Sequence, residues 1–181
     1  TSAANDRRPR GSTEFTFGSA EGPSALHGRG GTWFDRGMRA LQLTQWQHDP
    51  ELREVAQPDP GPGEVLVRIG GAGACHSDLH LIHDFPPGLM PWDPPFTLGH
   101  ENAGWVEAVG AGVTGLELGT PVAVYGPWGC GRCRRCRLGM ENYCEHQAEM
   151  AAASCGLGAD GGMAHHMLVP QSRWVVPLGD L

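Results

Sequence analysis

Four cysteines lie close together in the segment GPWGCGRCRRCRLGMENYC, residues 126–144. They are Cys130, Cys133, Cys136 and Cys144, in the spacing C-x2-C-x2-C-x7-C. Four thiolates at this spacing can form a tetrahedral shell around Zn²⁺. Because every position around such an ion is then a protein ligand, none is left for water or a substrate. The arginines between the cysteines partly offset the charge of a zinc tetrathiolate. We interpret residues 126–146 as a structural zinc lobe.

Two other interpretations of this array are weaker. An iron–sulfur cluster also uses C-x2-C-x2-C, but its fourth cysteine usually follows after three residues and precedes a proline. Here seven residues intervene, and Glu145 follows Cys144. A nucleic-acid zinc ribbon would explain the basic run RCRRCR, but the formal net charge of the chain is −7. An acidic chain with one isolated array argues against a nucleic-acid partner.

A second set of candidate ligands lies in the stretches CHSD and GHE. Cys75 and His100 are ligand types of catalytic zinc, where three protein groups leave the fourth position open. Asp78 and Glu101 are carboxylates next to them, and such carboxylates fix the tautomer and ring orientation of a metal-bound histidine. The sequence therefore predicts a reactive metal site that is separate from the four-cysteine array.

A path for a proton is also present near Cys75. Ser77 follows two residues later, and its hydroxyl could hydrogen-bond an oxygen on the metal. His80 lies about one helical turn further on and could carry the proton to solvent.

Short apolar segments separated by glycine and proline predict a mainly β domain with short helices, of a barrel-like kind. One segment, 60–73, gives a turn and then a strand with Val65, Val67 and Ile69 on one face. The only helix expected before residue 100 begins near Ser77–Asp78, both good N-cap residues, and runs to 84. Further strands are expected at 38–46, 104–113, 120–126, 163–170 and 173–177.

Residues 1–37 are rich in Gly, Ser, Arg and Thr and show no periodicity, so we expect a disordered extension before a domain at 38–181. The extension could be a regulatory tail, or Met38 could be the true start. No apolar run approaches the length of a membrane span, and no signal peptide is apparent, which argues against a membrane partner. The crowded cysteines favour a reduced, cytoplasmic protein.

The stretches GAGACHSDLH, TLGHE, GAGVTGLELGTPVAV and GPWGCGRCRRCRLGMENYC together resemble the zinc-dependent alcohol dehydrogenases of the medium-chain dehydrogenase/reductase superfamily. The bacterial branch that acts on secondary and aryl-substituted alcohols is the most similar. The resemblance runs from about Met38 to the end of the chain. It implies a GroES-like β-barrel domain, a zinc ion as Lewis acid, NAD(P) as hydride acceptor, and a small alcohol or carbonyl compound as substrate.

The resemblance also implies a role for each site residue. Cys75 and His100 match two ligands of the catalytic zinc, and Glu101 matches the acidic neighbour behind the metal. Asp78 matches the partner of the ligand histidine. Ser77 matches the hydroxyl that takes the alcohol proton, and His80 matches the end of the proton relay. His76 matches the residue near the cofactor pyrophosphate. The four cysteines match the structural zinc site.

Two features that the resemblance implies are not found in residues 1–181. The third catalytic ligand, a Cys or Asp, lies beyond a segment like VPLGDL, and the dinucleotide-binding domain follows it. No G-x-G-x-x-G stands between a strand and a helix. Cys155 or Asp160 could take the place of the third zinc ligand, but the family gives no support for either. Glu101 is a better candidate for that ligand. Cys155 is expected to be a buried thiol.

We therefore expect the chain to be the N-terminal part of a dehydrogenase, as a truncated product, a fragment or half of a split protein, and to be inactive alone. A homo-oligomer or a missing C-terminal half would be its partner. The alternative is a noncatalytic zinc-binding module used for protein association. Phe85, Trp92 and Phe96 are expected either to line a substrate pocket or to form aromatic core.

Overall fold

The computed structural model describes residues 37–179. The expected extension therefore lies outside the described residues, except for Gly37, which opens the first strand. None of the helices between residues 37 and 179 is long and apolar enough to cross a membrane.

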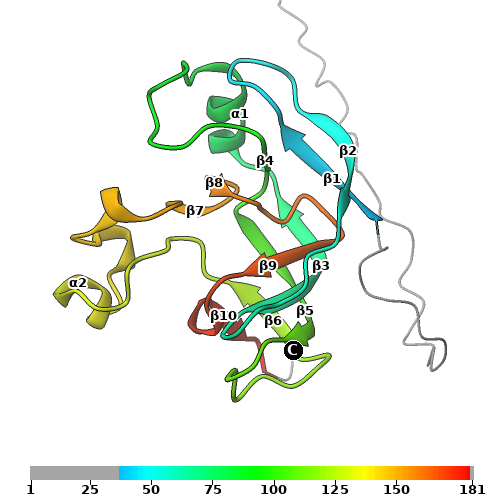
Figure 1. The fold of residues 1–181 in the computed structure, drawn as a ribbon, viewed down its shortest axis with the longest axis vertical. Coiled ribbons are helices and arrows are strands. Elements are labelled where there is room, and N and C mark those ends of the chain that lie inside the picture. Colours follow the sequence, from blue (N-terminus) through cyan, green and yellow to red (C-terminus); the bar gives the residue numbers. More distant parts are fainter. Residues whose placement is uncertain (1–36, 180–181) are drawn as a thin grey trace, which may run out of the picture. The chain divides into compact units, whose positions relative to one another are not determined.

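A five-stranded antiparallel sheet carries most of the fold (Figure 1). Its strand order is β10-β6-β5-β3-β9. The five strands are β3 (Val65–Gly73), β5 (Glu101–Val109), β6 (Pro121–Val124), β9 (His166–Val169) and β10 (Val175–Pro177). These confirm the strands expected in 60–73, 104–113, 120–126, 163–170 and 173–177, with β5 beginning three residues earlier than the expected segment.

Two smaller sheets complete the pairing. A three-stranded sheet has the order β2-β1-β4, and β7 pairs with β8 in parallel. Their strands are β1 (Gly37–Leu43), β2 (Glu51–Ala56), β4 (Phe96–Thr97), β7 (Ser154–Cys155) and β8 (Gly158–Ala159). The strands of residues 37–179 thus form three open sheets and no closed barrel. Beside β1, an isolated bridge joins Ala40 to Ala164.

Helix α1 (His76–His83) begins directly after β3. Its N-cap is Cys75 rather than the expected Ser77 or Asp78, because the Cys75 Sγ accepts the backbone N–H of Ser77. The Asp78 carboxylate reaches back to the Cys75 backbone N–H at 2.9 Å, which completes a reciprocal capping box. The other helices are short: α2 (Arg134–Arg137) and the 3₁₀ turns η2 (Glu141–Tyr143), η3 (Gln147–Glu149) and η4 (Ser172–Trp174).

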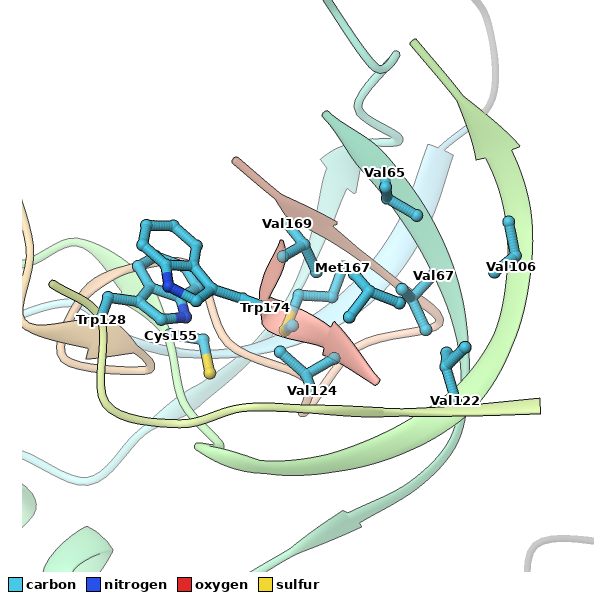
Figure 2. Packing of buried hydrophobic residues seen from close by; sticks show 11 residues of the cluster. Val65, Val67, Val106, Val122, Val124, Trp128, Cys155, Met167, Val169 and Trp174 are labelled. Atoms are coloured by element: carbon cyan, nitrogen blue, oxygen red, sulfur yellow. The ribbon is translucent and has the colours of Figure 1, made fainter. Parts of the chain in front are cut away.

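The main core lies against the five-stranded sheet (Figure 2). Val65 and Val67 are fully buried and Ile69 packs against the same cluster, which confirms the expected face of β3. Each fully buried valine of this kind contributes about 1.5 kcal/mol or more. At one end of the cluster, the indoles of Trp128 and Trp174 stack at 4.6 Å between centroids and 5° between planes.

A second cluster is aromatic and packs around Trp46, which is buried and donates from Nε1 to Asp93 at 2.8 Å. Trp92 and Phe96 meet edge to face at 5.6 Å, and Phe85 lies 6.3 Å from Trp46. All three aromatics pack in this cluster, as one of the two expectations has it, and none of them lines the cavity described below.

Candidate functional site

The four cysteine sulfurs of the lobe converge, all within 4.8 Å of one another. Cys133, Cys136 and Cys144 are buried, and Cys130 is half-buried. Backbone N–H groups point at three of the sulfurs: the Cys133 N–H at Cys130, the Cys136 N–H at Cys133, and the Cys130 and His146 N–H groups at Cys144, over 3.3–3.4 Å. Such bonds favour the thiolate form, which is the form that binds metal.

The chemistry of the donor set fits Zn²⁺. Burial raises the pKa of Cys136 to about 12. Burial also acts to raise the pKa of Cys130, but hydrogen bonds from the backbone of Arg132 and Cys133 and from neighbouring thiols bring it down to about 6. Four sulfurs this close cannot all be thiolates without a cation between them, and a soft-ligand tetrahedral ion such as zinc meets that need.

The lobe is built locally. Cys133 caps α2, its Sγ accepting the Cys136 N–H, and α2 extends away from the five-stranded sheet (yellow in Figure 1). Among the arginines of the array, Arg132 pairs with Glu149 at 3.5 Å rather than facing only the sulfurs.

The second group of donors is built from distant parts of the chain. The Cys75 Sγ lies 3.3 Å from the His100 Nε2, and a Glu101 carboxylate oxygen lies within 4.8 Å of both. Gly73, at the end of β3, pairs with Glu101, at the start of β5. The antiparallel register therefore brings residue 75 next to residue 100. A Cβ on Gly73 would lie 2.4 Å from the Glu101 Oε2, so only glycine leaves room for that carboxylate.

Asp78 holds the histidine of this group. Its buried carboxylate accepts the Cys75 N–H through Oδ2, and Oδ1 lies 3.6 Å from the His100 Nδ1. Neither Oδ1 nor Nδ1 has a hydrogen-bond partner among the described residues. The carboxylate thus faces one ring nitrogen while the other faces Cys75, an arrangement that orients a ligand histidine.

The remaining expected residues lie exposed on α1. The His76 and His80 rings are 4.5 Å apart, and the His80 Nδ1 lies 2.5 Å from the Asp84 Oδ2. Ser77, in the first turn, touches the Cys75 sulfur through its backbone N–H.

The two substitute ligands lie elsewhere. Cys155 is fully buried, as expected, and burial raises the pKa of its thiol. Asp160 accepts the Thr97 N–H at 2.7 Å. Neither belongs to the donor group of Cys75 and His100 within residues 37–179.

A cavity of about 300 Å³ lies beside His100, and its lining residues were not predicted from the sequence. Its walls combine apolar and amide side chains, and several come from the four-cysteine lobe. The lining residues are His100, Gly126, Pro127, Trp128, Asn142, Gln147, Ala153, Ser154 and Leu157. One feature of the sequence pointed toward these wall residues: Trp128, Asn142 and Gln147 lie within three residues of a cysteine of the lobe. His100 is thus part of both the donor group and the cavity wall.

The sequence model of the alcohol dehydrogenase GroES-like domain matches residues 61–180. The chain belongs to this family. The match covers both donor groups and every strand of the five-stranded sheet.

Known relatives support this assignment of the GroES-like domain. An alcohol dehydrogenase of Geobacillus stearothermophilus is 40% identical over 71% of this chain and 36% of its own length. D-arabinose 1-dehydrogenase (NADP(+)) of Saccharolobus solfataricus is 37% identical over 79% of this chain and 39% of its own. The cobalt- and zinc-bound thermostable alcohol dehydrogenase of Pyrobaculum aerophilum is similar in structure, with a TM-score of 0.68, 36% identity, and coverage of 81% of this chain and 42% of that one. The GroES-like chain spans about two fifths of the length of these relatives.

One sequence feature of this GroES-like domain imitates a cofactor fingerprint. Residues 110–115, GAGVTG, have the spacing G-x-G-x-x-G, but they form the turn between β5 and β6 and no helix follows. Gly110 packs so closely that a Cβ would lie 1.7 Å from the Gly61 carbonyl oxygen, and Gly112 has a positive φ of 83°. These glycines serve the turn, and the dinucleotide fingerprint requires a helix N-terminus at that place.

Proposed function

We propose that this chain is the metal- and substrate-binding part of an NAD(P)-dependent alcohol dehydrogenase, which oxidises primary or secondary alcohols to aldehydes or ketones. One observation carries the proposal: His100 belongs both to the donor group with Cys75 and Glu101 and to the wall of the cavity. A molecule in that cavity would lie beside the metal, as the reaction requires.

Cys75, His100 and Glu101 would hold a catalytic zinc, and Cys130, Cys133, Cys136 and Cys144 a structural one. The catalytic ion would supply a Lewis acid that lowers the pKa of an alcohol hydroxyl toward neutrality. Cys75, His100 and Glu101 are three protein donors, so the fourth position on their metal would be open to substrate. The four-cysteine site would be closed, because all four positions there are protein ligands.

The chain itself orients the donors. Asp78 fixes Cys75 through its backbone N–H and faces the His100 Nδ1, which leaves Nε2 toward the sulfur. The Ser77 N–H donates to the Cys75 Sγ and holds that sulfur at the start of α1. The apolar walls contributed by Pro127, Trp128 and Leu157 would hold the carbon skeleton of the alcohol.

Two side chains on α1 would move the proton. The Ser77 hydroxyl would accept it from the alcohol, and His80 would pass it to solvent. Asp84 occupies the His80 Nδ1 at 2.5 Å, so Nε2 is the nitrogen that exchanges the proton. His80 is about half exposed, which suits the solvent end of a relay.

A nicotinamide would accept the hydride, and His76, exposed at the start of α1, would approach its pyrophosphate. Because the chain holds no strand–G-x-G-x-x-G–helix unit in residues 37–179, we propose that purified residues 1–181 do not turn over NAD(P). Reduction of NAD(P) by this chain with an alcohol would overturn that part of the proposal.

Metal content tests the function. We expect two zinc ions per chain, falling to one in Cys75→Ala and to one in Cys130→Ala. Cys155→Ala is the matched control and keeps both, since Cys155 belongs to neither donor group. One ion in the unchanged chain that persists in Cys75→Ala would instead support the noncatalytic zinc-binding module.

A further inference from the structure

Glu141 is a buried carboxylate at the junction of the lobe and the sheet, and no step above uses it. It lies in η2, three residues before Cys144. Its Oε2 accepts two hydrogen bonds of 2.8 Å, from the Gly129 N–H and the Trp174 Nε1. Its Oε1 receives the Nη1 of Arg173. A buried charge held by three donors is expensive to leave partly unpaired, so this arrangement is tightly specified.

Gly129 is the residue on which these contacts converge. Its N–H donates to Glu141, and its carbonyl accepts from the Arg173 Nη2 at 2.5 Å. A Cβ on Gly129 would lie 2.6 Å from the Cys136 Sγ, so the backbone here runs directly against the sulfur cluster. Because Gly129 stands between Trp128 and Cys130, fixing both of its polar groups fixes a cavity residue and a metal donor together.

Trp128 is held from a second side as well. Its indole stacks on Trp174 at 4.6 Å, and the Arg173 guanidinium lies 4.6 Å above the centre of the Trp174 ring. Figure 2 shows the two indoles lying parallel, one over the other, at the edge of the main core. Arg173 and Trp174 belong to η4, immediately before β10. The contacts therefore connect the sulfur cluster, the cavity wall and the edge of the five-stranded sheet.

We infer that Glu141 and Arg173 are positioning residues, which couple metal binding in the four-cysteine loop to the placement of Trp128 in the cavity wall. The structural metal would then set the shape of the cavity beside His100 as well as stabilising the lobe. Only the use of that cavity for alcohol rests on the proposed function. The coupling itself does not depend on that activity.

The stacked indoles provide a spectroscopic readout, since two indoles held face to face with their transition moments rotated relative to each other give an exciton couplet in ultraviolet circular dichroism. We would titrate the chain with Co²⁺, whose thiolate charge-transfer absorption reports filling of the loop. Every sample carries Cys75→Ala, so that the loop alone supplies thiolates. In the otherwise unchanged chain the couplet and the absorption are expected to rise together, with one midpoint.

Glu141→Gln is expected to weaken cobalt binding about tenfold, as loss of a partner outside the ligand shell does. The couplet is then expected to stop following the absorption, because Trp128 is no longer held to the loop. Glu107→Gln is the matched control: Glu107 pairs with Arg68 at 3.6 Å on the surface, and its loss should alter neither signal.

Arg173→Met covers the case in which Glu141→Gln fails to fold. It keeps the bonds of Glu141 to Gly129 and Trp174, and a partial loss of the couplet response is expected. A purely structural role would lower the melting temperature and leave the couplet response unchanged in the folded variants, which overturns the inference. Neither signal depends on turnover, so failure of the proposed activity would leave this test intact.

Discussion

The four-cysteine lobe takes its donors from residues 130–144, whereas the second site combines residue 75 with residues 100 and 101. Three of the four cysteines of the lobe are buried, and backbone N–H groups of the lobe point at its own sulfurs. The second site depends on the pairing of β3 with β5, the cap of α1 and the carboxylate of Asp78. The difference separates the two tasks: a local site can stabilise the fold, and a site assembled from several elements can be open on one side.

Breaking the lobe should have the largest effect. Cys133→Ala is expected to abolish metal binding in the loop and to lower the free energy of unfolding by several kcal/mol, since structural zinc binding contributes on the order of 10 kcal/mol in small domains. Thermal unfolding with and without a chelator measures this. If the unchanged chain unfolds at the same temperature with the chelator present, the lobe does not stabilise the fold through a metal.

Breaking the second site should remove a metal at little structural cost. Cys75→Ala is expected to lose one ion and about 1 kcal/mol, the usual cost of a lost N-cap. Metal analysis and thermal unfolding of the same sample measure both effects. A loss of stability as large as that of Cys133→Ala would show that the two sites do not divide the tasks as described.

Asp78→Asn should weaken the second site without touching the lobe. The affinity for the second ion is expected to fall by about 10- to 100-fold, because the amide cannot orient His100 as the carboxylate does. Competition with a metal-sensitive dye gives the affinity. Asp160→Asn is the control, since its amide oxygen can still accept the Thr97 N–H and it lies outside the donor group.

The smallest effect is expected from one added methyl group. Gly73→Ala places a Cβ 2.4 Å from the Glu101 Oε2 and should displace that carboxylate, which lowers the affinity of the second site by about tenfold at most. Gly71→Ala lies on the same strand, and its Cβ would have nothing within 4 Å. Equal affinities in the two variants would exclude Glu101 as the third donor.

The sequence predicted the regular strands and the lobe because their signals are local. Val65, Val67 and Ile69 alternate, and the cysteine spacing is short. It missed β2 because Leu52 and its neighbours in Glu51–Ala56 lie exposed, and only pairing with β1 defines that strand. The two-residue strands β4, β7 and β8 are likewise defined by their partners.

The candidate site likewise combines features that local sequence predicts with contacts between distant residues that it does not. Cys75 and His100 were paired from their ligand types and neighbouring carboxylates, and then through a resemblance. Their contact depends on the β3–β5 register, which no local pattern encodes. The cap of α1 was misassigned because Cys75 is not a usual N-cap residue, although its sulfur accepts the bond that a hydroxyl would. The cavity wall at Trp128 depends on a stacking contact with a residue 46 positions away, Trp174.

His100 belongs both to the donor group and to the cavity wall, so its imidazole can report on both. One ring edge faces a sulfur donor while the residue also borders a hollow large enough for a small organic molecule. A guest that enters the hollow is therefore expected to change the magnetic environment of this residue. Imidazole resonances in an NMR spectrum would register the guest and the metal as two shifts of one signal.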